Sequence, residues 1–165
     1  MIRIICKLAF ICRLESFKSV NQDYPLSVSK HMSRTEKQKI GDWGEEQAVL
    51  FLSRHKYNIV DRNYCIYEKG KKGGEVDIVA WNDKHYFGRT LCFIEVKTRT
   101  YGEGSAERAT RKKEKFSAFL KAARRYCLDK KVDINNTPIQ FEQVSVYVNN
   151  RTKEVKFKKY EIPVE

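Results

Sequence analysis

Two stretches decide the fold: GEVDIVAW at Gly74–Trp81 and FIEVKTR at Phe93–Arg99. Their β-branched and aromatic residues favour strands, predicted at Glu75–Trp81 and Thr90–Thr98. The polar segment NDKHYFGR between them suits a hairpin loop. Residues two apart on a strand point the same way, so this pairing would set Asp77 beside Glu95, with Lys97 one step along the same face.

These three side chains have a coherent chemistry. Two carboxylates held close repel each other unless one takes up a proton or a cation lies between them. Mg²⁺ or Mn²⁺ suits such hard oxygen ligands, and can orient a phosphodiester and lower the pKa of a bound water. A lysine ammonium can stabilise charge that develops on the phosphoryl oxygens. The set predicts phosphodiester hydrolysis; ordinary cross-strand charge pairs on an exposed face are the alternative.

Further helices and strands are predicted on both sides of these two strands. Apolar spacing predicts one helix from about Glu36 to His55 and another from Ala106 to about Leu128. Further strands are expected at Tyr57–Tyr67, Ile139–Val148 and Val155–Ile162. The order α-β-β-β-α-β-β, with a long crossover through the second helix, predicts an α/β fold with a mixed sheet flanked by helices.

Glu45 adds a third carboxylate near the start of the first helix. At helical spacing it lies on the same edge as Ala48 and Leu52, toward the buried side. A glutamate there needs a partner, which a metal site beneath the helix would supply. A capping or ion-paired glutamate is the alternative, and the sequence does not decide between the two.

The chain is strongly basic. Its 165 residues carry a formal charge of +12, which suggests a polyanionic partner such as nucleic acid or, alternatively, a solvated basic surface. Many basic residues fall between Arg99 and Arg125, where they could form a track for phosphates; a solvated helix face is the alternative. The candidate nucleic-acid contacts are Arg99, Arg111, Lys112, Lys113 and Lys115.

Cysteine usage and hydropathy indicate a reduced, cytoplasmic protein. The five cysteines have no C-x-x-C spacing, and Cys92 and Cys127 lie in apolar runs typical of a core. No stretch approaches the ~20 apolar residues of a membrane helix. Residues 1–36 are predicted to be an N-terminal extension, disordered or a misassigned start, because Met32 opens a natural beginning. The domain is then expected over residues 37–165.

Four motifs in order carry a resemblance to a known family. They are GDWGEEQAVLFL (Gly41–Leu52), VDRNY (Val60–Tyr64), GEVDIVAW and FIEVKTR. Together they resemble the YraN-like family, uncharacterised protein family 0102, over about residues 37–148. That family looks like a member of the PD-(D/E)XK nuclease superfamily, so the resemblance implies a restriction-endonuclease-like α-β-β-β-α-β core.

The resemblance also implies roles for individual residues. Asp77 corresponds to the metal-binding aspartate, Glu95 and Lys97 to the (D/E)-x-K pair, and Glu45 to the helix glutamate that completes the site. A lysine in the second helix is usual, and both Lys113 and Lys115 fit.

The chain also departs from the family pattern. The superfamily proline before the aspartate is absent, and Cys65 stands roughly where the family often has arginine. Glu142 stands where an aspartate is more usual, and the basic turn KGKKGG at Lys69–Gly74 is longer than expected.

Taken together, these features favour a Mg²⁺-dependent nuclease-like protein that hydrolyses phosphodiester bonds in DNA, including branched or damaged DNA. A non-catalytic nucleic-acid-binding module on the same fold is the alternative. We expect DNA rather than RNA as the partner and no membrane association. Because many nucleases of this kind cut two strands as dimers, a homodimer is compatible with the sequence.

Overall fold

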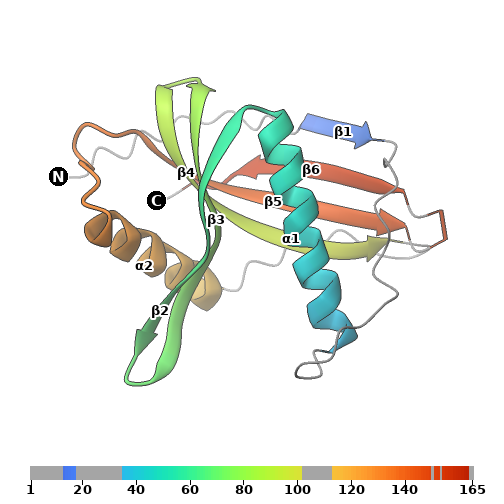
Figure 1. Ribbon diagram of the computed structural model, residues 1–165, viewed down its shortest axis with the longest axis horizontal. Helices are drawn as coiled ribbons and strands as arrows, with labels where there is room; N and C mark the ends of the chain where they lie inside the picture. Colours follow the sequence, from blue (N-terminus) through green and yellow to red (C-terminus); the bar gives the residue numbers. More distant parts are fainter. Residues whose placement is uncertain (1–12, 18–34, 102–112, 150, 153, 164–165) are drawn as a thin grey trace.

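The described part of the chain forms a six-stranded mixed sheet with one helix against each face (Figure 1). The computed structural model describes residues 13–17, 35–101, 113–149, 151–152 and 154–163. The strand order is β1-β6-β5-β4-β3-β2, in which β4 and β5 run parallel and the other neighbours antiparallel. The elements are β1 (Arg13–Phe17), α1 (Glu36–Arg54), β2 (Tyr57–Glu68), β3 (Lys71–His85), β4 (Gly88–Tyr101), α2 (Lys113–Asp129), β5 (Ile139–Asn149) and β6 (Val155–Glu161).

This architecture confirms the predicted α/β class and the α-β-β-β-α-β order. The crossover through α2 makes β4 and β5 parallel, as the long connection between them predicted. The predicted start of the second helix at Ala106 lies outside the described residues. Arg13–Phe17, in the stretch set aside as an extension, forms strand β1 along β6.

Helix α1 begins at Glu36, directly after its N-cap residue Thr35. Thr35 accepts a hydrogen bond from the backbone N–H of Gln38, and the Gln38 side chain accepts one from the backbone N–H of Thr35. This capping box satisfies two of the donors that a helix start leaves open. The buried face of α1, which includes Ala48, Phe51 and Leu52, then packs on the sheet.

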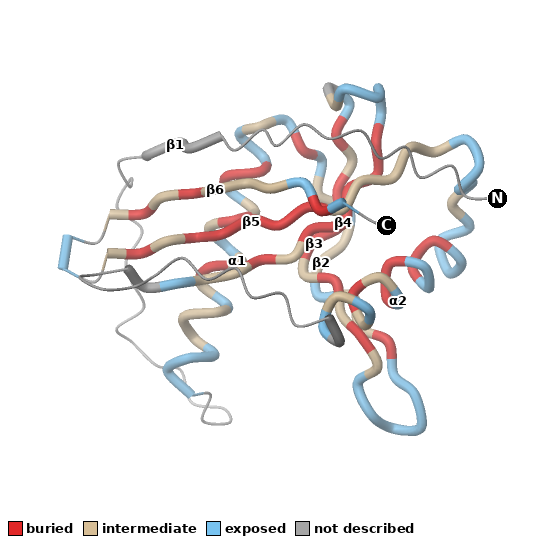
Figure 2. Tube along the Cα trace, turned by 180° about the vertical axis from the view of Figure 1, so that it is seen from behind, coloured by how far each residue is buried: buried red, intermediate tan, exposed pale blue. Residues whose placement is uncertain are grey.

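Both faces of the central strands are covered (Figure 2). Ile78, Ala80, Cys92 and Ile94 belong to the core cluster that contains the buried residues of α1. Val79, Leu91 and Phe93 belong to the cluster that contains Phe119, Ala122 and Ala123 of α2. The face that carries the acidic residues is therefore polar only locally, since Val79 and Phe93 on that face are fully buried.

Strands β3 and β4 separate partway along their length. Their ladder runs from the hairpin end to the pair Ile78–Ile94. Beyond that pair β3 continues beside β2, while β4 continues beside β5 as far as Tyr101 (Figure 1). We call this point the fork. Asp77 and Glu95 are the first residues past it, one on each branch.

A glycine in α1 fixes how closely the helix approaches the β4 branch. A Cβ added at Gly44 would lie 1.7 Å from Thr98 Oγ1 and 2.8 Å from Thr98 Cβ, closer than atoms can come. At Gly41, one turn earlier, an added Cβ meets nothing within 4 Å. Gly44 is thus required by packing, whereas Gly41 is not.

Alanine substitutions at these two glycines are expected to have opposite effects. Gly41→Ala should raise the free energy of unfolding by about 0.5–1 kcal/mol, because alanine is the better helix former. Gly44→Ala should lower it by about 1–3 kcal/mol, because the added methyl overpacks against Thr98. Urea denaturation of the two variants measures both values, and two stabilised variants would contradict the close contact.

Candidate functional site

Asp77 occupies the fork with its carboxylate turned to the opposite branch. The backbone N–H of Val96 donates a hydrogen bond of 2.6 Å to Asp77 Oδ2. The N–H of Val96 lies just past the last β3–β4 ladder pair, where a backbone carbonyl no longer faces it. The carboxylate therefore satisfies a β4 donor that the separation of the strands would otherwise leave without a partner.

Glu95 and Lys97 lie on the β4 branch and form an ion pair with each other. Residues 95 and 97 point to the same face of the strand, as the alternation predicted. Their side chains are 24% and 34% exposed, so both keep access to solvent. The structure thus brings Asp77, Glu95 and Lys97 together at the fork, with charges that act on one another.

The electrostatics of Asp77 reflect this setting. Burial is the largest cause of a pKa raised to about 7, and repulsion from Glu95 and Glu45 adds to it. The Val96 N–H and the Lys97 ammonium act in the opposite direction without restoring the usual pKa. A carboxylate so placed is poorly stabilised when ionised and would gain from a nearby cation.

Glu45 lies at the edge of the site on α1. It is half-buried, and its pKa is raised by burial first and by repulsion from Asp42 and Glu75, while a hydrogen bond from the Asn63 side chain opposes the rise. Glu45 also contributes to the raised pKa of Asp77, which places it within electrostatic reach of the fork. Other groups that act on the Glu45 carboxylate, Asp42, Asn63 and Glu75, lie on α1 and on the β2–β3 hairpin.

Glu75 is a neighbour that the sequence did not single out as a site residue. It forms an ion pair with Lys72 and accepts a hydrogen bond from the Cys65 thiol. Its position two residues before Asp77 was the available indication, because it places both acids on one face of a strand. Glu75 thus extends the acidic character of the site along β3.

Groups of side chains that could bind a metal ion are small in the described part of the chain. Within residues 13–17, 35–101, 113–149, 151–152 and 154–163, no three or more His, Cys, Asp or Glu side chains gather closely enough to hold a metal. Cys92 and Cys127 are buried free thiols, which confirms their predicted place in the core. Any divalent cation at the fork would depend on Asp77 and Glu95 together with ligands from outside the chain.

The candidate nucleic-acid contacts are only partly described. Arg99 on β4 and Lys115 on α2 are exposed. Arg111 and Lys112 lie outside the described residues, and Lys113 opens α2 with a side chain that is also outside them. Later on α2, Lys121, Arg124 and Arg125 are exposed as well.

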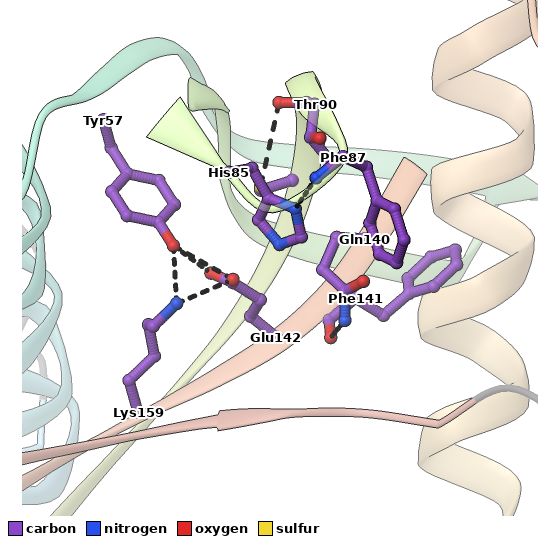
Figure 3. Close-up of polar contacts among 9 residues, drawn as sticks. Tyr57, His85, Phe87, Thr90, Gln140, Phe141, Glu142 and Lys159 are labelled. Atoms are coloured by element: carbon purple, nitrogen blue, oxygen red, sulfur yellow. Dashed lines mark hydrogen bonds and ion pairs between the residues drawn. The ribbon is translucent and has the colours of Figure 1, made fainter. Parts of the chain in front are cut away.

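A second polar cluster joins Tyr57, Glu142 and Lys159 (Figure 3). Glu142 is fully buried, and its two carboxylate oxygens each accept a hydrogen bond of 3.0 Å from the Tyr57 hydroxyl. Lys159 Nζ lies 2.9 Å from Glu142 Oε1 and 2.7 Å from the Tyr57 hydroxyl. Glu142 therefore holds β5, β6 and the start of β2 together, which is a structural role.

Comparisons with known proteins give one consistent family. The sequence model of the uncharacterised protein family UPF0102 matches residues 44–146, a span that contains Glu45, Asp77, Glu95 and Lys97. Within the described residues, no helix is both long enough and apolar enough to cross a membrane.

Individual relatives agree with this match. A UPF0102 protein of Koribacter versatilis is 37% identical over 117 residues, covering 71% of this chain and 74% of the relative. One of Chlorobium phaeobacteroides is 36% identical over 117 residues, covering 70% and 81%. One of Caldicellulosiruptor saccharolyticus is 36% identical over 116 residues, covering 68% and 86%.

Removing the countercharge of Glu142 should destabilise the fold strongly. Lys159→Met leaves a buried carboxylate without its ion pair and is expected to lower the free energy of unfolding by about 3–5 kcal/mol. Tyr57→Phe removes hydrogen bonds but keeps the ion pair, and should cost about 1–3 kcal/mol. Urea denaturation compares the two variants; a smaller loss for Lys159→Met than for Tyr57→Phe would contradict the assigned role.

Asp77→Asn should remove a pH-dependent loss of stability. The pKa of about 7 in the folded protein exceeds the value of about 4 in an unfolded chain. The stability that Asp77 contributes is therefore fully present below pH 4 and is lost as the pH rises through 7. Asparagine keeps an oxygen that accepts from the Val96 N–H but carries no charge.

In EDTA, the stability of Asp77→Asn relative to wild type should accordingly be higher at pH 8 than at pH 5, by at least about 1 kcal/mol. Asp83→Asn, at an exposed acid on the β3–β4 hairpin, serves as the matched control and should show no such trend. If the free energies of unfolding of Asp77→Asn and wild type differ by the same amount at both pH values, the fork does not raise the pKa of Asp77.

Proposed function

We propose that this chain, which belongs to the uncharacterised protein family UPF0102, is a metal-dependent hydrolase of phosphodiester bonds in DNA. The observation that carries the proposal is the electrostatic repulsion between the Asp77 and Glu95 carboxylates at the fork, with the Lys97 ammonium paired to Glu95. The same three residues correspond to the D and (D/E)-x-K positions of the PD-(D/E)XK nucleases, so the local chemistry and the resemblance agree.

The residues at the fork fit Mg²⁺ or Mn²⁺. Mg²⁺ commonly binds through one or two carboxylates and completes its coordination with waters and substrate phosphate oxygens, so a third protein ligand is not required. Asp77 and Glu95 repel each other, and Asp77 is half-protonated near neutral pH because of its pKa of about 7. A divalent cation held by both carboxylates would relieve this repulsion, with Glu45 as a supporting charge on α1.

When bound, such a cation would lower the pKa of a water molecule and neutralise charge on the scissile phosphate. Residues of the chain supply the rest of the chemistry. The Val96 N–H fixes the orientation of Asp77. Lys97, on the same face as Glu95, is placed to donate to a phosphoryl oxygen as negative charge develops on it. Exposed Arg99, two residues further along β4, would bind a neighbouring phosphate.

A non-catalytic DNA-binding role is favoured by one specific observation. Both carboxylates at the fork already have partners within the chain, since Asp77 accepts from Val96 and Glu95 pairs with Lys97. In a protein that only binds DNA these contacts would be permanent, and no divalent cation would be needed. Dependence of any product on Mg²⁺ therefore separates the two functions.

Cleavage assays test the proposal directly. Purified protein would be incubated with linear, nicked and four-way-junction DNA in Mg²⁺, Mn²⁺ or EDTA. We expect cleavage with either metal, none in EDTA, and a loss of at least about 100-fold in Asp77→Asn and Lys97→Ala with DNA binding retained.

The adjacent glutamates of α1 give a matched comparison in the same assay. Glu45→Gln should slow cleavage, because it removes a charge within electrostatic reach of Asp77. Glu46→Gln should not, because Glu46 lies on the exposed side of the helix and pairs with Arg62. Equal cleavage by wild type, Asp77→Asn and Lys97→Ala would refute the proposed mechanism.

A further inference from the structure

The β2–β3 hairpin extends past the fork, and its tip is strongly basic. We define the arm as residues 64–76, the part of the hairpin beyond the last β3–β4 ladder pair. Figure 1 shows the arm leaving the sheet beside α2, and Figure 2 shows its tip fully exposed. The proposed catalytic chemistry uses no residue of the tip, which contains the basic turn that is longer than the family resemblance predicts.

The turn itself places a lysine in an unfavourable backbone conformation. Glu68 pairs with Lys71, so the turn consists of Lys69 and Gly70, with φ of 48° and 76°. A two-residue turn with two positive φ values favours asparagine followed by glycine. Lysine adopts such a φ less readily than asparagine does, so this turn departs from the residue that its backbone favours.

Helix α2 braces the arm from one side. A Cβ added at Gly74 would lie 2.2 Å from the backbone oxygen of Ala118, so the arm and the helix touch backbone to backbone. Ile66 and Val76 of the arm pack in the same cluster as Phe119 of α2. The tip is thus held in a fixed position relative to Asp77, which lies on the same strand.

The charge at the tip is only partly neutralised. Glu68 pairs with Lys121, and Lys72 pairs with Glu75. Lys69 and Lys71 are exposed, and no carboxylate in the described part of the chain forms an ion pair with either. Two exposed lysines on a braced hairpin are complementary to a polyanion with regularly spaced charges.

We propose that Lys69 and Lys71 bind the phosphate backbone of double-stranded DNA at a distance from the bond held at Asp77. This inference rests on the proposed function, since it assumes that DNA lies across the fork. Lys71 and Asp77 are six residues apart on β3, which corresponds to about 20 Å along an extended strand. At 3.4 Å per base pair, the tip would reach phosphates about six base pairs from the fork.

Binding of a fluorescein-labelled 20-base-pair duplex in EDTA tests the arm without turnover. Fluorescence anisotropy would give Kd from 50 to 200 mM NaCl for wild type and for Lys69→Asn combined with Lys71→Gln. The matched control is Lys131→Asn combined with Lys56→Gln, because these exposed lysines also have positive φ values, 52° and 67°, and lie outside the arm.

The arm variant is expected to raise Kd about tenfold at 100 mM NaCl and to reduce the slope of log K against log salt by about two, one for each lost phosphate contact. The control should change Kd less than twofold. Because asparagine suits the turn better than lysine, the arm variant should unfold at no lower urea concentration than wild type, so weaker binding would not reflect unfolding.

The proposal is overturned if the arm variant binds like the control, or if the wild type does not bind the duplex. Its failure is distinguishable from that of the proposed function. Cleavage that requires Mg²⁺ and Asp77, together with unchanged binding by the arm variant, refutes the arm alone. Arm-dependent binding without any Mg²⁺-dependent product refutes the hydrolase alone.

Discussion

The arrangement of the fork depends on a single hydrogen bond. Where β3 and β4 separate, the backbone N–H of Val96 loses its ladder partner, and the carboxylate of Asp77 takes that place at 2.6 Å. The bond allows the sheet to divide without leaving an unsatisfied donor. It also holds a carboxylate in a buried position opposite Glu95, where its ionised form is disfavoured. The separation of the strands and the raised pKa of Asp77 thus have one physical origin.

The rest of the molecule holds the two branches of the fork in place. Gly44 lets α1 lie directly against Thr98 on the β4 branch, and Gly74 lets α2 lie directly against the β3 branch. Both contacts leave no room for a side chain. The buried network of Glu142, Tyr57 and Lys159 ties β5 and β6 to the start of β2. The site residues are therefore carried by strands that are fixed on both sides.

Much of this could be predicted from the sequence, because strand alternation is a local property. GEVDIVAW and FIEVKTR alone placed Asp77, Glu95 and Lys97 on one face, and the long crossover predicted the parallel β4–β5 pair. The fork could not be predicted, because the alternation along a strand does not say where its pairing with a neighbour ends. The sequence also indicated a turn at Lys69–Gly74, whereas β3 begins at Lys71. The Glu142 network was also beyond reach, since its hydrogen bond joins residues 85 positions apart. Burial of Val79 and Phe93 depends on α2, which only the folded chain brings to that face.

The central claim is that Asp77 and Glu95 together hold one divalent cation. Titration of Mn²⁺ followed by electron paramagnetic resonance, with the protein alone and with a non-cleavable phosphorothioate duplex, measures this directly. We predict one bound Mn²⁺ per chain in the wild type with the duplex present, and its loss in both Asp77→Asn and Glu95→Gln. Mn²⁺ binding that is the same in wild type and both variants, or absent from all three, would contradict the account.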